Sequence, residues 1–440
     1  MDDLPVMAGS TSPQQSPDSH HMQEPITAPS STVPEKPIAA ASLGPDRMET
    51  PMLTGTMAAP TDLRESESKK ADPEKMDLKD TDAEDKDGEE WVTEDEDDED
   101  DEELSGVPAA MPYPYQPGAL LRLRRVRDSS QITVKIQKPM DKRTLSCGMT
   151  VGIEEGPDDT DHYKDKLVFL KMFDWRFSSQ ARDNVGALPF TRLDRKMYTE
   201  MIMADKMDGF FDQIRPVRGR WDKCSSNWTC TEYEAAMALD MQEYYHSEMS
   251  VYARLLDLQG VCIPQFFAAV ELDITPKGIR PNKQQRKHFQ VSGILLQYIP
   301  GVPLSEVTNY PLQAPGATHK DIVDTAIRLV SAVSDRNVIN GDCNTRNFIV
   351  PLEMDKEQKL VCKPFQIDFG LARVRGWNET WPQWCRAKWS ADEEGTIARD
   401  MQPRLERIGI KYPYQRSLRY CEHAPVDERN KALRLVLGSD

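Results

Sequence analysis

Two short polar stretches in the carboxy-terminal part of the chain constrain its fold more than any other feature. The first comprises residues 340–347 (NGDCNTRN), and the second is Asp368-Phe369-Gly370. Apolar residues follow the first stretch at 348–350 and precede the second at 365–367, and each run is typical of a short strand. The sequence therefore predicts that the two polar stretches adjoin the two strands of a hairpin.

The polar residue types in these stretches suit the binding of a metal and a triphosphate. Asp342 and Asn347 are five residues apart, and Asp368 follows Asn347 by 21 residues. Mg²⁺ bound to a triphosphate takes hard oxygen ligands, namely one or two carboxylates together with phosphate oxygens. An Asp-Phe-Gly turn alone is common after a buried strand, so the interpretation depends on both stretches and their flanks together.

With these flanks, the two stretches resemble the catalytic loop and the metal-binding loop of the protein kinase-like superfamily, in particular its divergent members common in fungi. The resemblance implies an α+β fold with two lobes, and ATP and Mg²⁺ as cofactors. It implies that Asp342 accepts the proton of the attacking hydroxyl and that Asn347 and Asp368 bind the metal. Arg346, four residues after Asp342, would place a cation near the γ-phosphate.

The first 110 residues differ from the rest of the chain in charge. They contain 30 of the 73 Asp and Glu but only 8 of the 55 Lys and Arg, so they carry −22 while the remainder is near +4. We expect a disordered tail, because such a composition cannot bury enough apolar surface to offset chain entropy. Residues 94–103 are ten consecutive acids, which are either a solvated segment or a docking site for a basic partner.

Residues 111–440 suffice for one large domain with two lobes or for two modest domains, and the order of the motifs favours two lobes of one kinase-like fold. We place the amino-terminal lobe at about 118–299, with an insertion at 176–230, and the carboxy-terminal lobe at about 300–440. Only 67 residues follow Arg373 and no Ala-Pro-Glu motif is present, so the second lobe is expected to be shortened. The four tryptophans between residues 377 and 389 are expected to pack its core.

Strands are predicted at 121–127, 132–136, 149–153 and 166–173 from their apolar patterns. The first (LRLRRVR) suits a half-exposed edge strand, although a nuclear localisation signal would also fit. The resemblance implies that the strand at 166–173 presents a lysine, Lys171, to the α- and β-phosphates of ATP. The alternative is a strand-end lysine that faces solvent.

A long helix is predicted from about residue 231 to 259. Residues 231–234 have the pattern of a capping box, and Gly260 is placed as a stop. The resemblance implies that a glutamate on this helix orients Lys171. Glu248 is the candidate for that role, with Glu243 and Glu200 as alternatives.

Further elements are predicted downstream of this helix. The apolar run at 291–299 predicts a buried strand that leads into the hinge, where the resemblance implies that backbone groups of Gln297 and Ile299 bind adenine. Helical spacing of apolar residues predicts a buried helix at 321–333. Residues 390–393 are expected to cap another helix, which either breaks at Pro403 or ends at Gly409.

Two departures from the family pattern leave a second interpretation open. The GxGxxG loop that covers the phosphates in kinases has no match, since only Gly148 and Gly152 are available. Asn340 and Gly341 replace the usual His and Arg, so control by a phosphorylated activation loop is not expected. The chain is therefore either an ATP- and Mg²⁺-dependent phosphotransferase that acts on a protein or small-molecule hydroxyl, or a pseudokinase or interaction module without catalysis.

The expected location follows from what the sequence does not contain. It has no signal peptide and no apolar run that approaches the roughly 20 residues needed to span a bilayer. Its eight cysteines show no CxxC spacing. We expect a soluble intracellular protein, in the cytoplasm or the nucleus. Nucleic-acid binding is not expected, because the folded part is near neutral.

Overall fold

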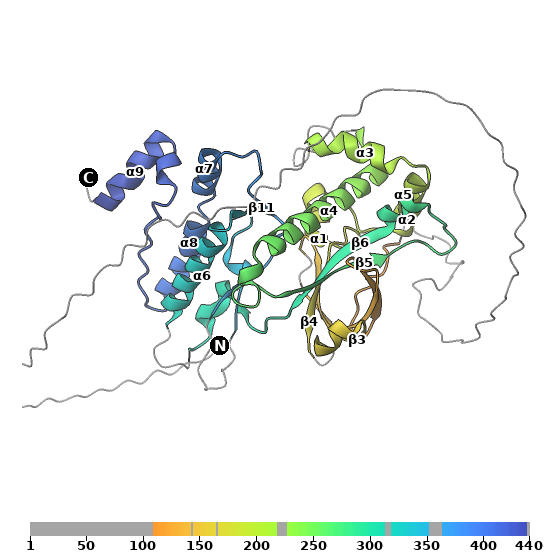
Figure 1. Cartoon of the computed structure of the whole chain (residues 1–440), viewed down its shortest axis with the longest axis horizontal. Coiled ribbons are helices and arrows are strands. Elements are labelled where there is room, and N and C mark those ends of the chain that lie inside the picture. Colours follow the sequence, from red (N-terminus) through yellow and green to blue (C-terminus); the bar gives the residue numbers. More distant parts are fainter. Residues whose placement is uncertain are drawn as a thin grey trace, which may run out of the picture. The chain divides into compact units, whose positions relative to one another are not determined.

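Antiparallel strands between residues 120 and 297 close into a barrel (Figure 1). The computed structural model describes residues 109–141, 144–163, 166–217, 227–312, 318–351 and 363–437; the predicted tail lies outside these ranges except for residues 109 and 110. The barrel order is β1-β2-β3-β4-β6-β5. Its strands are β1 (Leu120–Arg125), β2 (Gln131–Pro139), β3 (Cys147–Glu155), β4 (Val168–Met172), β5 (Phe266–Asp273) and β6 (Gln290–Gln297). The predicted α+β class is confirmed.

Strand β1 closes the barrel. Its residues alternate between exposed and buried, as the period-2 pattern predicts. It pairs with β2 along its length and also with β5, through Arg124 and Arg125. The prediction of an edge strand is therefore wrong, because a closed barrel pairs the strand on both sides and leaves no edge.

The long helix α4 (Cys230–Arg254) is present, but both of its ends differ from the prediction. Thr229 caps it, since its side chain accepts from the N–H of Glu232 and the Glu232 carboxylate accepts from the N–H of Thr229. Glu234, the expected partner in a cap at 231–234, is instead buried against Arg182 at 2.7 Å. The helix ends before a short 3-10 turn (Leu256–Leu258), and Gly260 adopts a left-handed φ of 69° only after that turn.

Helix α4 contacts both the barrel and more distant elements. It packs against β6 and against β11 (Ala372–Val374), which follows the Asp-Phe-Gly stretch. It also packs against α2 (Arg192–Met203) and α3 (Met207–Ile214), which lie in the predicted insertion together with α1 (Ser179–Val185). Helix α4 therefore connects the strand of Lys171 with the polar stretches near the carboxyl end.

The predicted hairpin is confirmed. Strand β9 (Phe348–Val350) pairs antiparallel with β10 (Phe365–Gln366), and β7 (Val302–Pro303) pairs with the other side of β9. A second pair joins β8 (Val338–Asn340) to β11. Because Asn347 precedes β9 and Asp368 follows β10 closely, the antiparallel pairing brings both polar stretches to the same end of the hairpin.

The remaining described elements are mostly helical. They are α5 (Lys283–Arg286), α6 (His319–Ser334), α7 (Trp381–Ala391), α8 (Glu393–Arg407), α9 (Val426–Leu437), and 3-10 turns at Asp158–Tyr163, Arg215–Val217, Lys287–Phe289, Leu304–Asn309, Thr345–Asn347 and Cys421–His423. Helix α6 confirms the predicted buried helix, and it packs on α8. The cap predicted at 390–393 is wrong, because residue 390 lies inside α7 and α8 begins after Asp392, whose φ is 42°. Pro403 lies within α8 without ending it.

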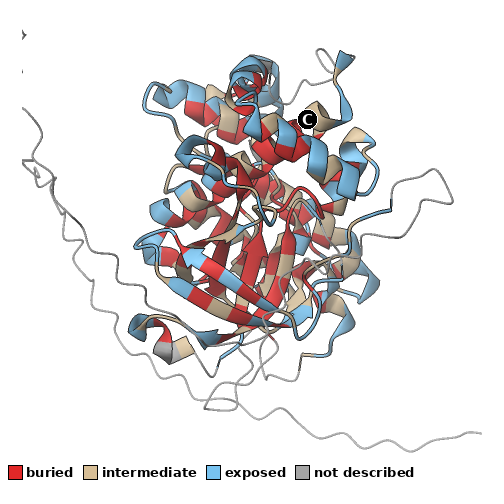
Figure 2. Cartoon of the chain, turned by 90° about the vertical axis from the view of Figure 1, so that its right-hand side faces the viewer, coloured by how far each residue is buried: buried red, intermediate tan, exposed pale blue. Residues whose placement is uncertain are grey.

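The four tryptophans divide into two groups. Trp384 and Trp389 are buried, as predicted, whereas Trp377 and Trp381 are 97% and 47% exposed. Figure 2 shows that buried residues line the barrel interior and the inner faces of the helices. Only two of the four tryptophans therefore serve as core.

Of the helices among the described residues, none is both long and apolar enough to cross a membrane.

Candidate functional site

Lys171 contacts two carboxylates from separate parts of the chain. Its Nζ atom lies 2.6 Å from Oε2 of Glu248 on α4 and 2.8 Å from Oδ1 of Asp368, which follows β10. Lys171 is on β4 between β3 and β6, where its backbone pairs with Gly148 and Ile294. Neither Glu243 nor Glu200, the alternatives from the sequence, makes a described contact with Lys171.

Burial and charge act in opposite directions at this cluster. Burial alone would lower the pKa of Lys171, but the carboxylates of Asp368 and Glu248 raise it above its ordinary value. The pKa of Asp368 is lowered, because the charge and hydrogen bond of Lys171 outweigh the effect of its burial. Burial raises the pKa of Glu248, although Lys171 opposes the shift. Lys171 is therefore held as a cation next to an ionised Asp368.

The backbone fixes the position of Asp368. Its φ is 61°, in the left-handed region that Asp adopts more readily than most residues. The next residue, Phe369, is fully buried and packs edge-on against Tyr252 of α4, with ring centroids 5.9 Å apart. The Asp368 side chain remains 35% exposed. Phe369 therefore anchors the turn while the carboxylate stays accessible.

Two amides hold the carboxylate of Asp342. Nδ2 of Asn344 donates to its Oδ1 at 2.8 Å, and Nδ2 of Asn347 donates to its Oδ2 at 3.0 Å. Both amides also donate to the backbone carbonyl of Asp342. Because Asn347 makes these hydrogen bonds through its amide nitrogen, its Oδ1 atom can still accept a hydrogen bond or bind a metal ion.

Asn340 connects the two polar stretches. Its Oδ1 atom accepts from the N–H of Asp342 at 3.0 Å, and its Nδ2 atom donates to the carbonyl of Asp368 at 3.3 Å. Asn340 is 2% exposed, so these hydrogen bonds form away from water. The sequence indicated Asn340 only as a departure from the usual His, and its bridging role was missed.

A buried ion pair that the sequence did not indicate supports Asn340. Glu393 accepts from the backbone N–H of Asn340 at 2.8 Å and forms an ion pair with Lys388. Lys388 also donates to the carbonyl of Val338 at 2.7 Å. The sequence does not indicate this ion pair, because Lys388 and Glu393 lie on either side of a helix boundary that the predicted cap at 390–393 does not reproduce.

Gly341 is required by a close backbone approach. A Cβ atom at this position would lie 2.7 Å from the carbonyl oxygen of Leu371, and the N–H of Gly341 donates to the same oxygen at 3.2 Å. The residue that replaces the usual Arg therefore lets the loop pack against the segment after Asp368.

The other predicted site residues make no described contact with this cluster. Gln297 ends β6 opposite Val168, three residues before Lys171 on β4, and its N–H donates to the carbonyl of Gln265 at 2.8 Å. Ile299 lies two residues beyond the end of β6. Arg346 is exposed, and within the described ranges its guanidinium has no hydrogen bond or ion pair.

The residues near Asp368 suit a small divalent cation that keeps phosphate oxygens as ligands. No group of three or more His, Cys, Asp and Glu side chains among the described residues could hold a metal ion by itself. Asn347 and Asp368 are nonetheless neighbours across the hairpin, since the N–H of Ile367 donates to the carbonyl of Asn347 at 2.9 Å. One accessible carboxylate and one amide oxygen are a hard donor pair that fits Mg²⁺ bound to a nucleotide.

Gly148 and Gly152 do not form a loop over this cluster. Both lie within β3, where Gly148 pairs with Lys171 and Gly152 pairs with Lys135. A Cβ atom at Gly148 would lie 2.8 Å from the ring of Phe169. These glycines therefore serve strand packing, and neither is part of a turn that could cover phosphates.

Comparisons with known proteins identify no family. No family model matches the sequence, and a search of curated proteins finds no match. Among solved structures, the chain is similar to one described as the ROP18 kinase domain in complex with AMP-PNP and sucrose. The TM-score is 0.35 and the identity is 12%, over 73% of this chain and 78% of that chain.

Proposed function

We propose that this chain is a protein kinase-like phosphotransferase that transfers the γ-phosphoryl group of ATP to a hydroxyl acceptor, with Mg²⁺. One observation carries the proposal: a buried lysine lies between carboxylates from two distant segments, and one of these segments is hydrogen-bonded through Asn340 to the loop of Asp342. Buried ion pairs contribute little to stability compared with apolar packing. Groups with shifted pKa values that converge in this way are typical of functional sites.

The proposed roles follow from the contacts. Lys171 would bind the α- and β-phosphates, and Glu248 on α4 would hold it in position. Asp368 and Asn347 would hold Mg²⁺, which when bound neutralises charge on the β- and γ-phosphates. Gln297 and Ile299, at the end of β6, would offer backbone groups to adenine. Arg346, exposed beside Asp342, would face the γ-phosphate.

Asp342 would orient the acceptor hydroxyl. The hydroxyl oxygen forms a bond to the γ-phosphorus, the bond from that phosphorus to the bridging oxygen breaks, and ADP leaves. The hydroxyl proton passes to a carboxylate oxygen of Asp342. Asn344 and Asn347 restrict the carboxylate to one orientation, which reduces the entropy lost when the reacting groups align.

The proposed architecture is a two-lobed kinase-like domain over residues 111–440. The barrel with α4 would form the first lobe, at about 118–299, with α1 to α3 inside the insertion at 176–230. The helices that follow would form a shortened second lobe, at about 300–440. The acceptor would be a protein or a small molecule. The site residues do not choose between the two, because position on a loop does not identify what enters a cleft.

A pseudokinase or interaction module is the second candidate, and two observations favour it. Gly148 and Gly152 lie in a strand, so no glycine turn there covers the phosphates. Lys171 also contacts Asp368 directly at 2.8 Å, which joins the proposed phosphate ligand to the proposed metal ligand. A protein of this kind would keep the ion pairs for the fold and would lack transfer.

Two substitutions separate the roles of the aspartates. Asp368→Asn removes the proposed anionic metal ligand, so the Mg²⁺-dependent part of the thermal shift produced by ATP should disappear. Asp342→Asn leaves both metal ligands in place, so the thermal shift should remain while transfer of radiolabelled γ-phosphate falls by about 10²-fold or more. Asp158→Asn, at an exposed site outside the cluster, is the matched control and should change neither.

Two results would contradict the proposal. If the unmodified protein shows neither a Mg²⁺-dependent shift with ATP nor transfer to itself or to a generic acceptor, the interaction module takes its place. If the shift is present and Asp342→Asn leaves transfer unchanged, Asp342 does not act on the nucleophile.

A further inference from the structure

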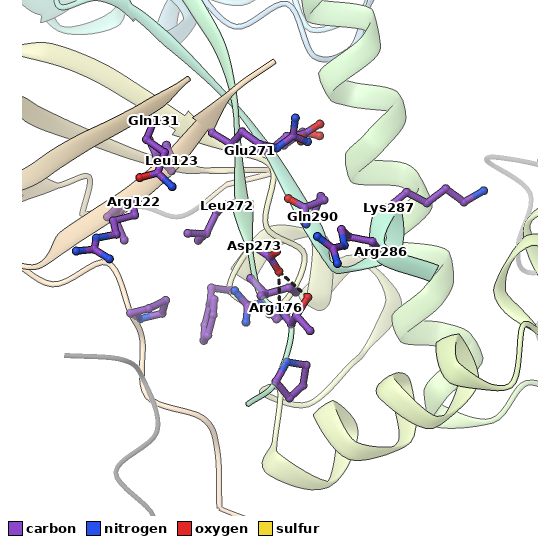
Figure 3. A pocket seen from close by; sticks show the side chains of 18 of the residues that line it. Arg122, Leu123, Gln131, Arg176, Glu271, Leu272, Asp273, Arg286, Lys287 and Gln290 are labelled. Atoms are coloured by element: carbon purple, nitrogen blue, oxygen red, sulfur yellow. Dashed lines mark hydrogen bonds and ion pairs between the residues drawn. The ribbon is translucent and has the colours of Figure 1, made fainter. Parts of the chain in front are cut away.

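One cavity of the described chain (Figure 3) has a lining separate from the residues proposed for phosphotransfer. It is open and has a volume of about 1800 Å³. Residues of β1, β2, β5, β6, α2, α4, α5 and the segment that precedes β1 line it. Figure 3 shows Arg122 of β1 on one side, Arg286 on the opposite side, and Arg176 with Asp273 between them. Lys171, Asp342 and Asp368 are not among the lining residues.

The lining of this cavity is strongly basic. Nine Lys and Arg side chains line it, against two carboxylates, Glu271 and Asp273. Three of the cations form described ion pairs: Arg124 with Glu271, Arg176 with Asp174, and Lys287 with Asp208. The excess positive charge predicts an anionic occupant.

Four lining cations have no ion-pair partner within the described ranges, namely Arg192, Lys277, Lys283 and Arg286. All four are exposed. Arg192 is the first residue of α2, where the helix dipole disfavours a cation. Its placement does not help the helix, which indicates that the charge serves another interaction.

The chain enters its described part beside this cavity. Ala110 forms a β-bridge with Thr191, and the N–H of Met111 donates to the carbonyl of Phe190 at 2.8 Å. Met111 and Pro112 line the cavity. The ten consecutive acids at 94–103 end eight residues before Met111, and a chain of that length spans at most about 25–30 Å.

We infer that the acidic run at 94–103 binds in this basic cavity of the same chain. The ten carboxylates are opposite in sign to the excess of cations in the lining. The short linker gives an effective concentration of the order of millimolar, so weak individual contacts suffice for occupancy. The exposed cations make the interaction electrostatic, and salt therefore weakens it. The inference does not depend on the proposed phosphotransfer.

The test measures whether the cavity of the intact chain is already filled. A fluorescein-labelled peptide of residues 92–105 is titrated with the full-length protein, and anisotropy reports binding at low salt. In one variant every Asp and Glu of residues 94–103 is replaced by Asn or Gln. This variant should bind the peptide at least about tenfold more tightly than the unmodified chain, because its own run no longer competes. Equal affinities overturn the inference.

A matched variant controls for the change in net charge. Ten of the Asp and Glu within residues 62–87 are neutralised instead, which removes the same charge from the tail and leaves residues 94–103 intact. This control should bind the peptide within about threefold of the unmodified chain. If it binds as tightly as the chain neutralised at 94–103, general repulsion explains the result and the inference fails.

Substitutions in the cavity locate the site. In the chain neutralised at 94–103, the triple change Arg192→Gln, Lys283→Gln and Arg286→Gln should weaken peptide binding at least about tenfold. The control removes three exposed cations elsewhere, by Arg407→Gln, Lys411→Gln and Lys431→Gln, and should weaken it less than about threefold. Equal losses overturn the inference. If the triple variant does not fold, Lys277→Gln with Arg286→Gln replaces it and is judged by the same criterion.

Sedimentation of the unmodified chain distinguishes binding within one chain from binding between two. Binding within one chain predicts that the chain sediments as a monomer at all concentrations. A dimer that dissociates when residues 94–103 are neutralised would assign the run to a second copy and overturn the inference.

Discussion

Lys388→Met tests the buried ion pair beneath the loop of Asp342. Lys388 and Glu393 are 5% and 7% exposed. The amine of Lys388 donates to the carbonyl of Val338 and pairs with Glu393, which accepts from the N–H of Asn340. Methionine preserves most of the side-chain volume and removes the charge and the donors.

The expected cost follows from the group that the substitution leaves behind. A buried charge that loses its partner destabilises a protein by about 3–5 kcal/mol. This is a large part of the roughly 5–15 kcal/mol that stabilises a typical domain. Adding Glu393→Gln removes the unpaired charge and keeps an acceptor for the N–H of Asn340. The double variant should therefore recover at least about half of the loss.

Urea unfolding, followed by tryptophan fluorescence, measures both free energies. The control is Lys411→Met, at an exposed residue outside this network, and it should change the free energy of unfolding by less than about 0.5 kcal/mol. A loss below about 1 kcal/mol for Lys388→Met would refute the reasoning. A double variant no more stable than the single one would also refute it, because the unpaired carboxylate would not be the cause.

Two further predictions concern pH and backbone packing. Burial lowers the pKa of His288, although Asp208 opposes the shift. The unfolded chain then binds the proton more readily, so the melting temperature should fall as pH drops from about 7 through the ordinary histidine pKa near 6.5. Thermal scans of His288→Gln should lose this pH-dependent fall, while those of His246→Gln, at an exposed site, should keep it. Gly341→Ala places a Cβ atom 2.7 Å from a carbonyl oxygen and should cost about 1–3 kcal/mol in urea unfolding. Gly209→Ala, inside helix α3 with no atom within 4 Å of the added Cβ, should instead raise the free energy of unfolding by about 0.5–1 kcal/mol. A Gly341→Ala variant as stable as the unmodified chain would contradict the close approach.

Elements that depend on local pattern could be predicted from the sequence. The barrel strands other than β5, the helix at 321–333 and the hairpin between β9 and β10 follow from periodicity and from short apolar runs. The same patterns do not determine at which residue each element begins or ends. Two threonines near the start of α4 each precede a glutamate by three residues, and burial of Glu234 against Arg182 leaves Thr229 as the cap.

Part of the candidate site could be predicted in the same way, since the polar types and spacings of Asp342, Asn347 and Asp368 are local features. The sequence also indicated Lys171 and, among three glutamates, Glu248. Only the tertiary structure brings Lys171 within 3 Å of carboxylates that lie 77 and 197 residues away. Contacts between residues so far apart leave no periodic trace in the sequence.

What the sequence by itself determined is therefore the type of each segment and the polar groups available for chemistry. Tertiary structure alone decided that β1 closes the barrel, that Asn340 joins the two polar stretches, and that Lys388 and Glu393 support it. It also gathered cations from β1, α2 and α5 around one cavity. The physical reason is that strand and helix patterns arise from neighbours along the chain, whereas buried polar partners and charged cavities arise from segments that only folding brings together.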